Sequence, residues 1–299
     1  MSNISGKSDL QTCKALGWSR RFLKQEDENR LSLQCYDQLH SVPKTDWESL
    51  LNTEDLTLSY DYLRDLTTKE TAQKSFYVLF TQAQTTIGVA YFTIASFSGP
   101  RVIDLIESSS PSGSKLLKWA RVGTKPIHAN ILCCGGSSTA EHYGFRFHES
   151  VTYQEGALAL EMAAEQILKT LYASNDSIGA VFFHGSPYAE YLGKRSYTCF
   201  EAEPNLKLSL DESWQHFEDY LSALSSKYRV KAKRADRKSE DLIVTSLSNQ
   251  QFQAKKHNLS ELYQQVVNRA EFALTDTGFD SISSLMNIHE TRVKIYYYE

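Results

Sequence analysis

Residues 75–97 read SFYVLFTQAQTTIGVAYFTIASF, and this stretch predicts two antiparallel strands. Phe76, Val78 and Phe80 occupy alternate positions, and the second half of the stretch is rich in β-branched and aromatic residues. Both patterns are typical of strands that pack against a core. A tight turn near Gln82 to Gln84 would join the two strands. The stretch therefore places a β-sheet at the centre of the fold.

Strand and helix patterns also follow this pair along the chain. An apolar strand is expected at 128–134, ended by Gly135-Gly136, and a second buried strand at 178–183. Between them, a helix is expected after Gly156, because apolar residues there recur on one helical face. The order of these elements predicts a mixed α+β fold.

A second group of elements begins with Ser209-Leu210-Asp211-Glu212, which has the pattern of a capping box. Apolar residues at helical spacing follow from Trp214, and the predicted helix continues into a basic stretch. Beyond it, the patterns predict a strand at 241–247, helices at 259–274 and 282–289, and a last strand at 293–298. These elements start a second lobe that contains fewer elements than the first.

The composition describes a folded chain. It has 299 residues, of which 41% are hydrophobic and 23% charged, which excludes an intrinsically disordered or collagen-like protein. The longest apolar runs are strand-sized, far below the ~20 residues that span a bilayer. The first thirty residues lack the apolar stretch of a secretory signal, so the expected compartment is the cytoplasm.

The five cysteines predict neither a disulfide framework nor a metal site. They are odd in number and contain no C-x-x-C pair. Cys133 and Cys134 are adjacent, and on a strand their side chains would point to opposite faces. We therefore expect reduced, structural thiols and no bound metal.

Positive charge is concentrated in residues 227–238. The net charge is −4, but residues 227–238, KYRVKAKRADRK, carry seven basic residues and one acid, leaving −10 for the rest of the chain. Lys227, Lys231, Arg234 and Lys238 are spaced by 4, 3 and 4 residues, so they share one helical face. Such a face attracts phosphates, anionic membranes or acidic segments. It is also compatible with a solvated surface.

A second candidate site is the loop CGGSSTAEHYGFRFH at 134–148. It lies between a predicted strand and a predicted helix, where binding and catalytic groups are common. Glu141, His142 and Tyr143 are the candidate catalytic residues, with Glu141 able to act as a general base. Gly135 and Gly136 permit a close approach of the backbone to a ligand. The alternative is a structural turn with a histidine bonded to backbone.

Several well-known motifs are absent from the sequence, namely the P-loop, G-x-G-x-x-G, G-x-S-x-G and H-E-x-x-H. Their absence argues against P-loop nucleotide hydrolysis, a dinucleotide fold, an α/β-hydrolase and a zincin.

Residues 213–235, SWQHFEDYLSALSSKYRVKAKRA, resemble a helix of the Fem-like and peptidoglycan-biosynthesis-type members of the GNAT acyltransferase superfamily. The segment ILCCGGSSTAEHYGFRF is similar to a strand and loop of uncharacterised bacterial members, and LSELYQQVVNRAEFAL to the helix that follows. The resemblance covers residues 40–299. It implies tandem GNAT-like lobes, in which helices flank a mixed, mostly antiparallel central sheet. We place the lobes at 35–206 and 207–299, after a polar tail and short helix at 1–34.

The resemblance also implies a function. Relatives transfer an acyl group to an amine, from acyl-CoA or, in the Fem branch, from aminoacyl-tRNA. The expected acceptor is a small molecule or a cell-wall precursor, and tRNA is a possible partner. Lys227, Arg229, Lys231 and Arg234 match the family's basic helix, and we expect them, with Gly135 and Gly136, to bind the ligand or its phosphates.

Two departures leave alternatives open. The pyrophosphate pattern R/Q-x-x-G-x-G/A is absent, and the second lobe ends at Glu299 before the strands with which relatives continue. The chain could therefore be a non-catalytic binder of nucleic acid or another anionic ligand, or a degenerate structural relative.

Overall fold

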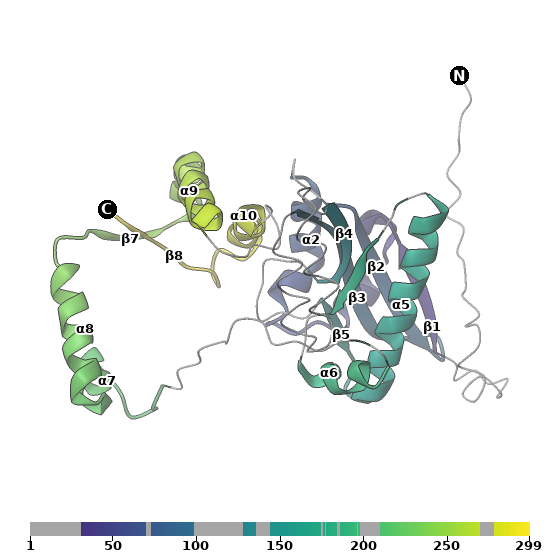
Figure 1. Cartoon of the computed structure of the whole chain (residues 1–299), viewed down its shortest axis with the longest axis horizontal. Helices are drawn as coiled ribbons and strands as arrows, with labels where there is room; N and C mark the ends of the chain where they lie inside the picture. Colours follow the sequence, from purple (N-terminus) through teal and green to yellow (C-terminus); the bar gives the residue numbers. More distant parts are fainter. Residues whose placement is uncertain are drawn as a thin grey trace, which may run out of the picture.

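The computed structural model describes residues 31–69, 73–98, 128–135, 144–174, 176, 178–183, 186–195, 197, 210–269 and 278–299. Its centre is a six-stranded sheet with the order β1-β2-β3-β4-β6, in which β5 also pairs with β3 (Figure 1). The strands are β1 Ser32–Tyr36, β2 Ser75–Gln82, β3 Thr85–Ser98, β4 His128–Cys134, β5 Phe145–Phe147 and β6 Ala180–Phe183. All neighbours are antiparallel except β4 and β6, which are parallel. The predicted mixed α+β class is confirmed.

The predicted strand pair is the β2–β3 hairpin. Gln82 pairs with Thr85, so only Ala83 and Gln84 form the turn. Both have positive φ, 47° and 63°, as a two-residue turn that matches the twist of a hairpin requires. The expected strands and turn are therefore confirmed, although neither turn residue is the glycine or asparagine that such turns usually contain.

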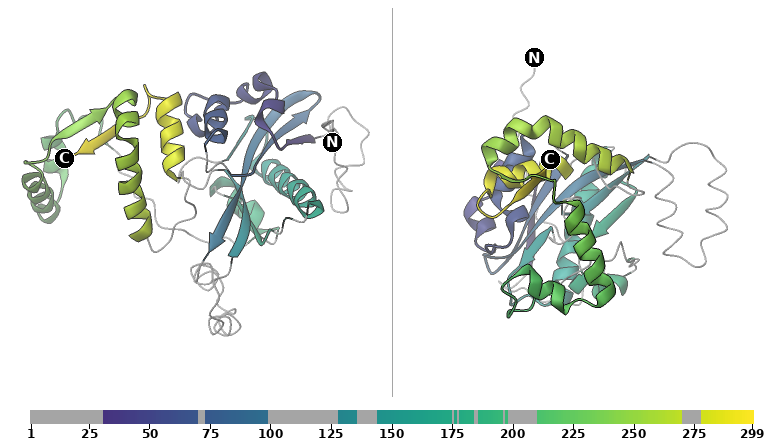
Figure 2. Two further views of the ribbon diagram at one scale, coloured as in Figure 1. Left: turned by 90° about the horizontal axis from the view of Figure 1, so that it is seen from above. Right: turned by 90° about the vertical axis from the view of Figure 1, so that its left-hand side faces the viewer.

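Helices cover both faces of the sheet (Figure 2). Helix α5, Tyr153–Ala173, packs on one face against the core that contains Phe76, Val78 and Phe80. The other face packs against α1, Lys44–Glu48, and α2, Tyr60–Thr67, together with the short helices η2, Leu39–Ser41, and η3, Leu56–Leu58. Strand β2 is buried on both faces, which explains why its sequence is almost continuously apolar.

Helix α5 begins earlier than its sequence pattern predicts. Thr152 is the N-cap, and Thr152 with Glu155 forms a reciprocal capping box. Gly156 therefore lies within the first turn and does not precede the helix. The capping residues fix the start, because they satisfy backbone N–H groups that the apolar periodicity does not report. A short helix, α6, Ser186–Gly193, follows β6.

The predicted helix from Trp214 into the basic stretch is two helices. Helix α7, Phe217–Ala223, ends at the extended residue Leu224, and α8, Ser226–Lys238, begins after the N-cap Ser225. The prediction of one continuous helix was wrong because apolar spacing continues across the break. The predicted capping serine, Ser209, lies outside the described residues, and α7 starts instead at His216.

The remaining elements are β7 Val244–Leu247, α9 Asn249–Arg269, α10 Gly278–Ile288 and β8 Ile295–Tyr298. Strands β7 and β8 form a two-stranded antiparallel sheet. Leu247, Phe252 and Met286 form a small core beneath it. The described residues thus contain a second group of elements, and its assignment as a second GNAT-like lobe stays a prediction.

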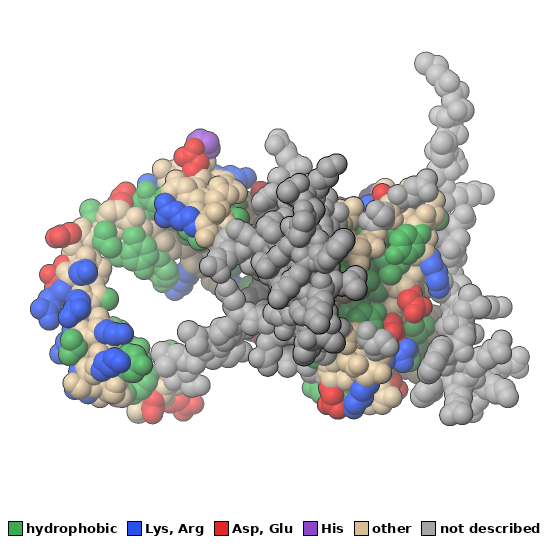
Figure 3. Space-filling view, in the orientation of Figure 1, with side chains coloured by type: hydrophobic (Ala, Val, Ile, Leu, Met, Phe, Trp, Pro, Cys, Tyr) green, Lys and Arg blue, Asp and Glu red, His purple; other side chains and the backbone are tan. Residues whose placement is uncertain are grey.

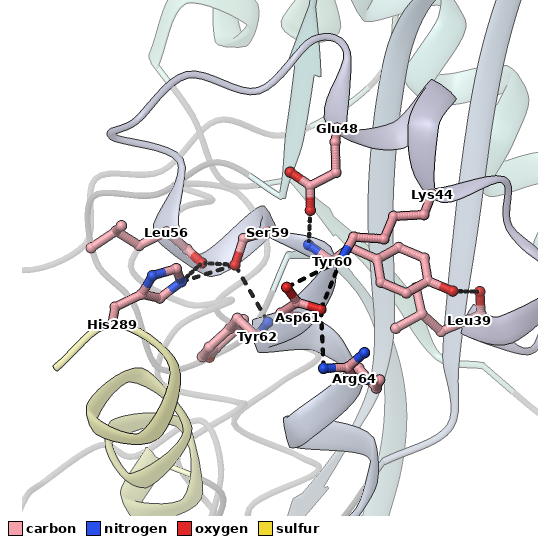
Figure 4. A network of polar contacts seen from close by, with 10 residues as sticks. All are labelled: Leu39, Lys44, Glu48, Leu56, Ser59, Tyr60, Asp61, Tyr62, Arg64 and His289. Carbon is pink, nitrogen blue, oxygen red and sulfur yellow. Dashed lines mark hydrogen bonds and ion pairs between the residues drawn. The ribbon is translucent and has the colours of Figure 1, made fainter. Parts of the chain in front are cut away.

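Helix α10 packs against α2, far from it in the sequence. Three serines of α10, Ser281, Ser283 and Ser284, are buried, and their small side chains allow a close approach between the helices. Polar contacts surround this packing (Figure 4). His289 Nε2 lies 2.9 Å from Ser59 Oγ and 3.2 Å from the Leu56 carbonyl oxygen. Asn287 and Arg292 add contacts to Asp65 and Glu54.

The packing at His289 predicts a pH-dependent stability. Burial lowers the pKa of His289, and Arg292 acts in the same direction, against the Leu56 carbonyl, Asp61 and Glu48. A histidine whose pKa is lower in the folded state favours the neutral form, so its contribution is complete above the unfolded pKa and declines as the pH falls below it. Replacement by Asn removes this titration.

We therefore compare the free energy of unfolding of wild type and His289→Asn by urea denaturation at about pH 7.5 and about pH 5.5. Wild type is expected to be more stable by about 1 kcal/mol at the higher pH. The advantage shrinks at the lower pH, where the protonated ring is disfavoured. An advantage that is equal at both pH values contradicts the prediction.

Candidate functional site

The carboxyl ends of β4 and β6 meet at one edge of the sheet. The two strands run parallel, with Cys133 beside Phe182 and Cys134 beside Phe183, and α5 connects them. In open parallel α/β sheets, ligands bind outside the carboxyl ends of the strands, and the β4–β6 pair is the part of this sheet that has that arrangement. This edge is therefore the candidate site that the topology selects.

Strands β4 and β5 both pair along β3, and the chain leaves the sheet between them. The Gly135 N–H donates to the Tyr91 carbonyl, and the Tyr91 N–H donates to the Gly144 carbonyl, both at 2.7 Å. Gly135 and Gly144 thus flank the same residue of β3. The segment 136–143 begins and ends at the candidate edge. Gly136, Glu141, His142 and Tyr143 belong to that segment and lie outside the described residues.

Gly135 is the predicted ligand-binding residue that the structure describes. Its φ is 98°, a conformation that favours glycine. Its N–H is bonded to Tyr91 and its carbonyl accepts a hydrogen bond from Thr93 Oγ1 at 3.0 Å. Gly135 therefore follows the end of β4 in a conformation that two hydrogen bonds to β3 hold in place. Its predicted role in ligand binding stays a prediction.

An aromatic cluster supports the edge beside β5. The Tyr188 ring of α6 lies 4.8 Å from Phe145 and 6.2 Å from Phe147, measured between ring centroids, and 5.4 Å from Tyr153. A Cβ added at Gly156 would lie 2.5 Å from Tyr188 Cε1, so glycine is needed for this approach. The cluster positions the first turn of α5 against β5. Sequence analysis missed it, although Phe145-Arg146-Phe147 and Gly156 were visible signals.

The first turn of α5 contains a carboxylate, that of Glu155. Glu155 Oε2 accepts hydrogen bonds from the Thr152 N–H at 2.9 Å and from Thr152 Oγ1 at 2.7 Å, and the Glu155 N–H donates to Thr152 Oγ1 at 3.3 Å. A carboxylate is stabilised there by the positive end of the helix dipole. A phosphate bound at this helix start would have to compete with Glu155.

The cysteines near the edge are not nucleophiles. Burial raises the pKa of Cys133 to about 12, and burial and the neighbouring Cys133 raise that of Cys134. Both thiols are therefore protonated at neutral pH, whereas the thiolate is the reactive form. Together with Cys35 they are free thiols, as expected. Cys13 and Cys199 lie outside the described residues.

The predicted basic residues lie away from this edge. Figures 1 and 2 show α7 and α8 at the opposite end of the molecule from β4 and β6. Lys227, Lys231 and Arg234 are exposed. Arg229 is different, since its guanidinium donates to the carbonyl oxygens of Leu221, Ser222 and Leu224 at 2.8–3.0 Å. Arg229 therefore joins α8 to the end of α7, and the structure does not bring the basic residues together with Gly135.

No metal-binding group of three or more His, Cys, Asp or Glu residues occurs among the described residues. None of the helices in the described ranges has the length and apolarity that crossing a bilayer requires. Comparison of the chain with protein-family models, curated proteins and solved structures found no significant match.

Proposed function

We propose that the chain is an N-acyltransferase that acts at the carboxyl edge of β4 and β6. The observation that carries the proposal is the parallel β4–α5–β6 unit, with a segment containing Glu141, His142 and Tyr143 that starts and ends at its edge. The resemblance to GNAT acyltransferases suggests acyl-CoA or aminoacyl-tRNA as the donor. The acceptor is an amine on a small molecule or a cell-wall precursor.

The proposed reaction is direct attack by the amine on the donor carbonyl. A C–N bond forms, and the C–S bond of the thioester, or the C–O bond of an aminoacyl ester, breaks. A base accepts the amine proton, and the leaving group departs as thiol or alcohol after protonation. The candidate bases are Glu141 and its neighbour His142, with Tyr143 beside them. A backbone N–H at the edge would stabilise the charge on the carbonyl oxygen.

Isothermal calorimetry of the whole chain against acetyl-CoA, longer acyl-CoAs and charged tRNA tests the proposal. We expect at least one donor to bind. His142→Gln should retain that binding and lower turnover about 10²–10⁴-fold. The matched control is His257→Gln, because the His257 side chain is 92% exposed on α9. The proposal fails if no donor binds, or if both histidine variants turn over like wild type.

Glu155 gives a separate prediction about donor affinity. Glu155→Gln removes the negative charge at the start of α5, while the amide oxygen can still accept the capping hydrogen bond. If donor phosphates bind there, affinity should rise about two- to fivefold, the size of one charge at a helix terminus. Calorimetry with acetyl-CoA measures this affinity, and desulfo-CoA, which has no sulfur but keeps all the phosphates, is the control. Unchanged affinity in a normally folded variant would place the phosphates elsewhere.

The same capping box favours one second candidate, a structural relative that has lost the donor site. A carboxylate already bonded at the start of α5 occupies a natural position for an anion. If this second candidate is correct, neither wild type nor Glu155→Gln binds an acyl donor. The calorimetry described above therefore separates the two functions.

A further inference from the structure

We propose that α8 and the outer face of the β7–β8 sheet form a binding surface for single-stranded nucleic acid. This surface is distinct from the edge of β4 and β6, and the proposal does not depend on acyl transfer. It rests on two features, a dense row of exposed cations and a neighbouring row of exposed aromatic rings.

The cations belong to α8. Lys227, Lys231, Arg234 and Lys238 are all exposed, whereas Arg229, on another side of the helix, is partly buried toward α7. Within the described part of the chain, no α8 lysine or arginine forms an ion pair with a carboxylate. The repulsion among these charges is therefore not relieved by described carboxylates. A row of phosphates would relieve it.

The aromatic rings belong to β8. Tyr296 and Tyr298 alternate with the half-buried Ile295 and Tyr297, so both exposed rings lie on the outer face of the sheet, 53% and 60% exposed. Tyr298 pairs with Val244 of β7, which is also exposed. An exposed face with two tyrosines on the same side of a strand provides stacking positions for bases.

The two features are close along the chain. Only residues 239–243 separate the end of α8 from the start of β7, a span of at most about 20 Å. Figure 3 shows the blue Lys and Arg side chains along α8 and, next along the chain, green hydrophobic side chains along β7–β8. Single-stranded sites combine a positive groove with aromatic stacking over about 4–16 nucleotides.

Nucleic acid fits this surface better than an anionic membrane. A helix that lies on a membrane presents a continuous apolar face, but α8 has none, because its exposed apolar side chains, Tyr228 and Val230, lie on different sides. Base stacking also uses the exposed tyrosine rings of the sheet. An anionic membrane would be attracted by the cations of α8, and this attraction would not involve the tyrosine rings.

The test is fluorescence anisotropy of the whole chain with a labelled oligouridylate of about 20 nucleotides. Wild type should bind with an affinity that falls as salt rises. Lys231→Glu and Arg234→Glu should each weaken binding and reduce the salt slope by about 0.7. Lys169→Glu makes the same charge change at an exposed position on α5 and should leave binding unchanged.

Variants of Tyr296 test whether bases stack on the exposed tyrosine rings. Tyr296→Thr should weaken binding roughly fivefold or more, while Tyr296→Phe, which keeps the ring, should bind like wild type. Circular dichroism checks that each variant is folded. The proposal is overturned if wild type does not bind the oligonucleotide, if Lys169→Glu weakens binding as much as Lys231→Glu, or if the protein binds only phosphatidylserine vesicles.

Discussion

Trp47→Ala is expected to lower the free energy of unfolding by about 3–5 kcal/mol, the range for large aromatic residues in cores. Trp47 has no exposed surface, and its ring packs edge-on against Tyr77 with the centroids 6.0 Å apart. Its Nε1–H donates a 2.7 Å hydrogen bond to the Leu58 carbonyl. Truncation removes this packing and leaves the Leu58 carbonyl without its indole donor. Urea denaturation measures the loss.

Two further variants separate these contributions. Trp47→Phe keeps much of the ring volume but loses the N–H, so it should be less destabilising than Trp47→Ala. Tyr172→Ala is the surface control, because Tyr172 is 55% exposed, and it should change stability by no more than about 0.5 kcal/mol. If Trp47→Ala and Tyr172→Ala prove equally mild, this side of the core is not packed as described.

Gly144→Ala should also be strongly destabilising. A Cβ at this position would lie 2.0 Å from the Gly135 nitrogen and 2.2 Å from its Cα, both of which are backbone atoms. Gly135 is held by its hydrogen bond to Tyr91, so it cannot move aside without breaking the sheet. Overpacking of this kind costs typically about 1–3 kcal/mol, and backbone contacts lie at the upper end. The free energy of unfolding reports it directly.

Gly278→Ala is the matched control for this prediction. Its added Cβ would also be too close to another atom, the Tyr263 hydroxyl, at 1.7 Å. That atom ends a side chain that can rotate away, so the variant should lose much less stability than Gly144→Ala. Equal losses in the two variants would contradict the view that the junction of β4 and β5 is rigid.

Much of the sheet could be predicted from the sequence. The β2–β3 hairpin and strand β4 have local patterns of alternation, β-branched residues and flanking glycines, and the structure confirms them. The division of α7 from α8 was missed, although Ser225-Ser226 before the basic residues is a signal for a helix start. Apolar spacing continues through the break and does not report the extended backbone at Leu224.

The candidate site was predicted only in part. The loop after β4 was selected because its residue types are chemically active, but the alignment of the end of β4 with the end of β6 depends on the α5 crossover. The basic helix lies apart from the β4–β6 edge, so the structure does not bring the two groups of predicted ligand-binding residues together, and their roles stay predictions. Charge density along the sequence shows that Lys231 and Arg234 are available for an anionic partner, but it does not show which part of the fold they face.

The sequence by itself determined strands β2, β3, β4 and β6, the class of fold and the cationic face of α8, because each depends on residues within a few positions of one another. Only the tertiary structure decided the approach of Gly144 to Gly135, the approach of the Tyr188 ring to Gly156 and the contact of His289 with Ser59, 230 residues away. Such contacts leave no local pattern. They form when burial of the whole core brings distant segments together, and the atoms that meet depend on how all the elements pack.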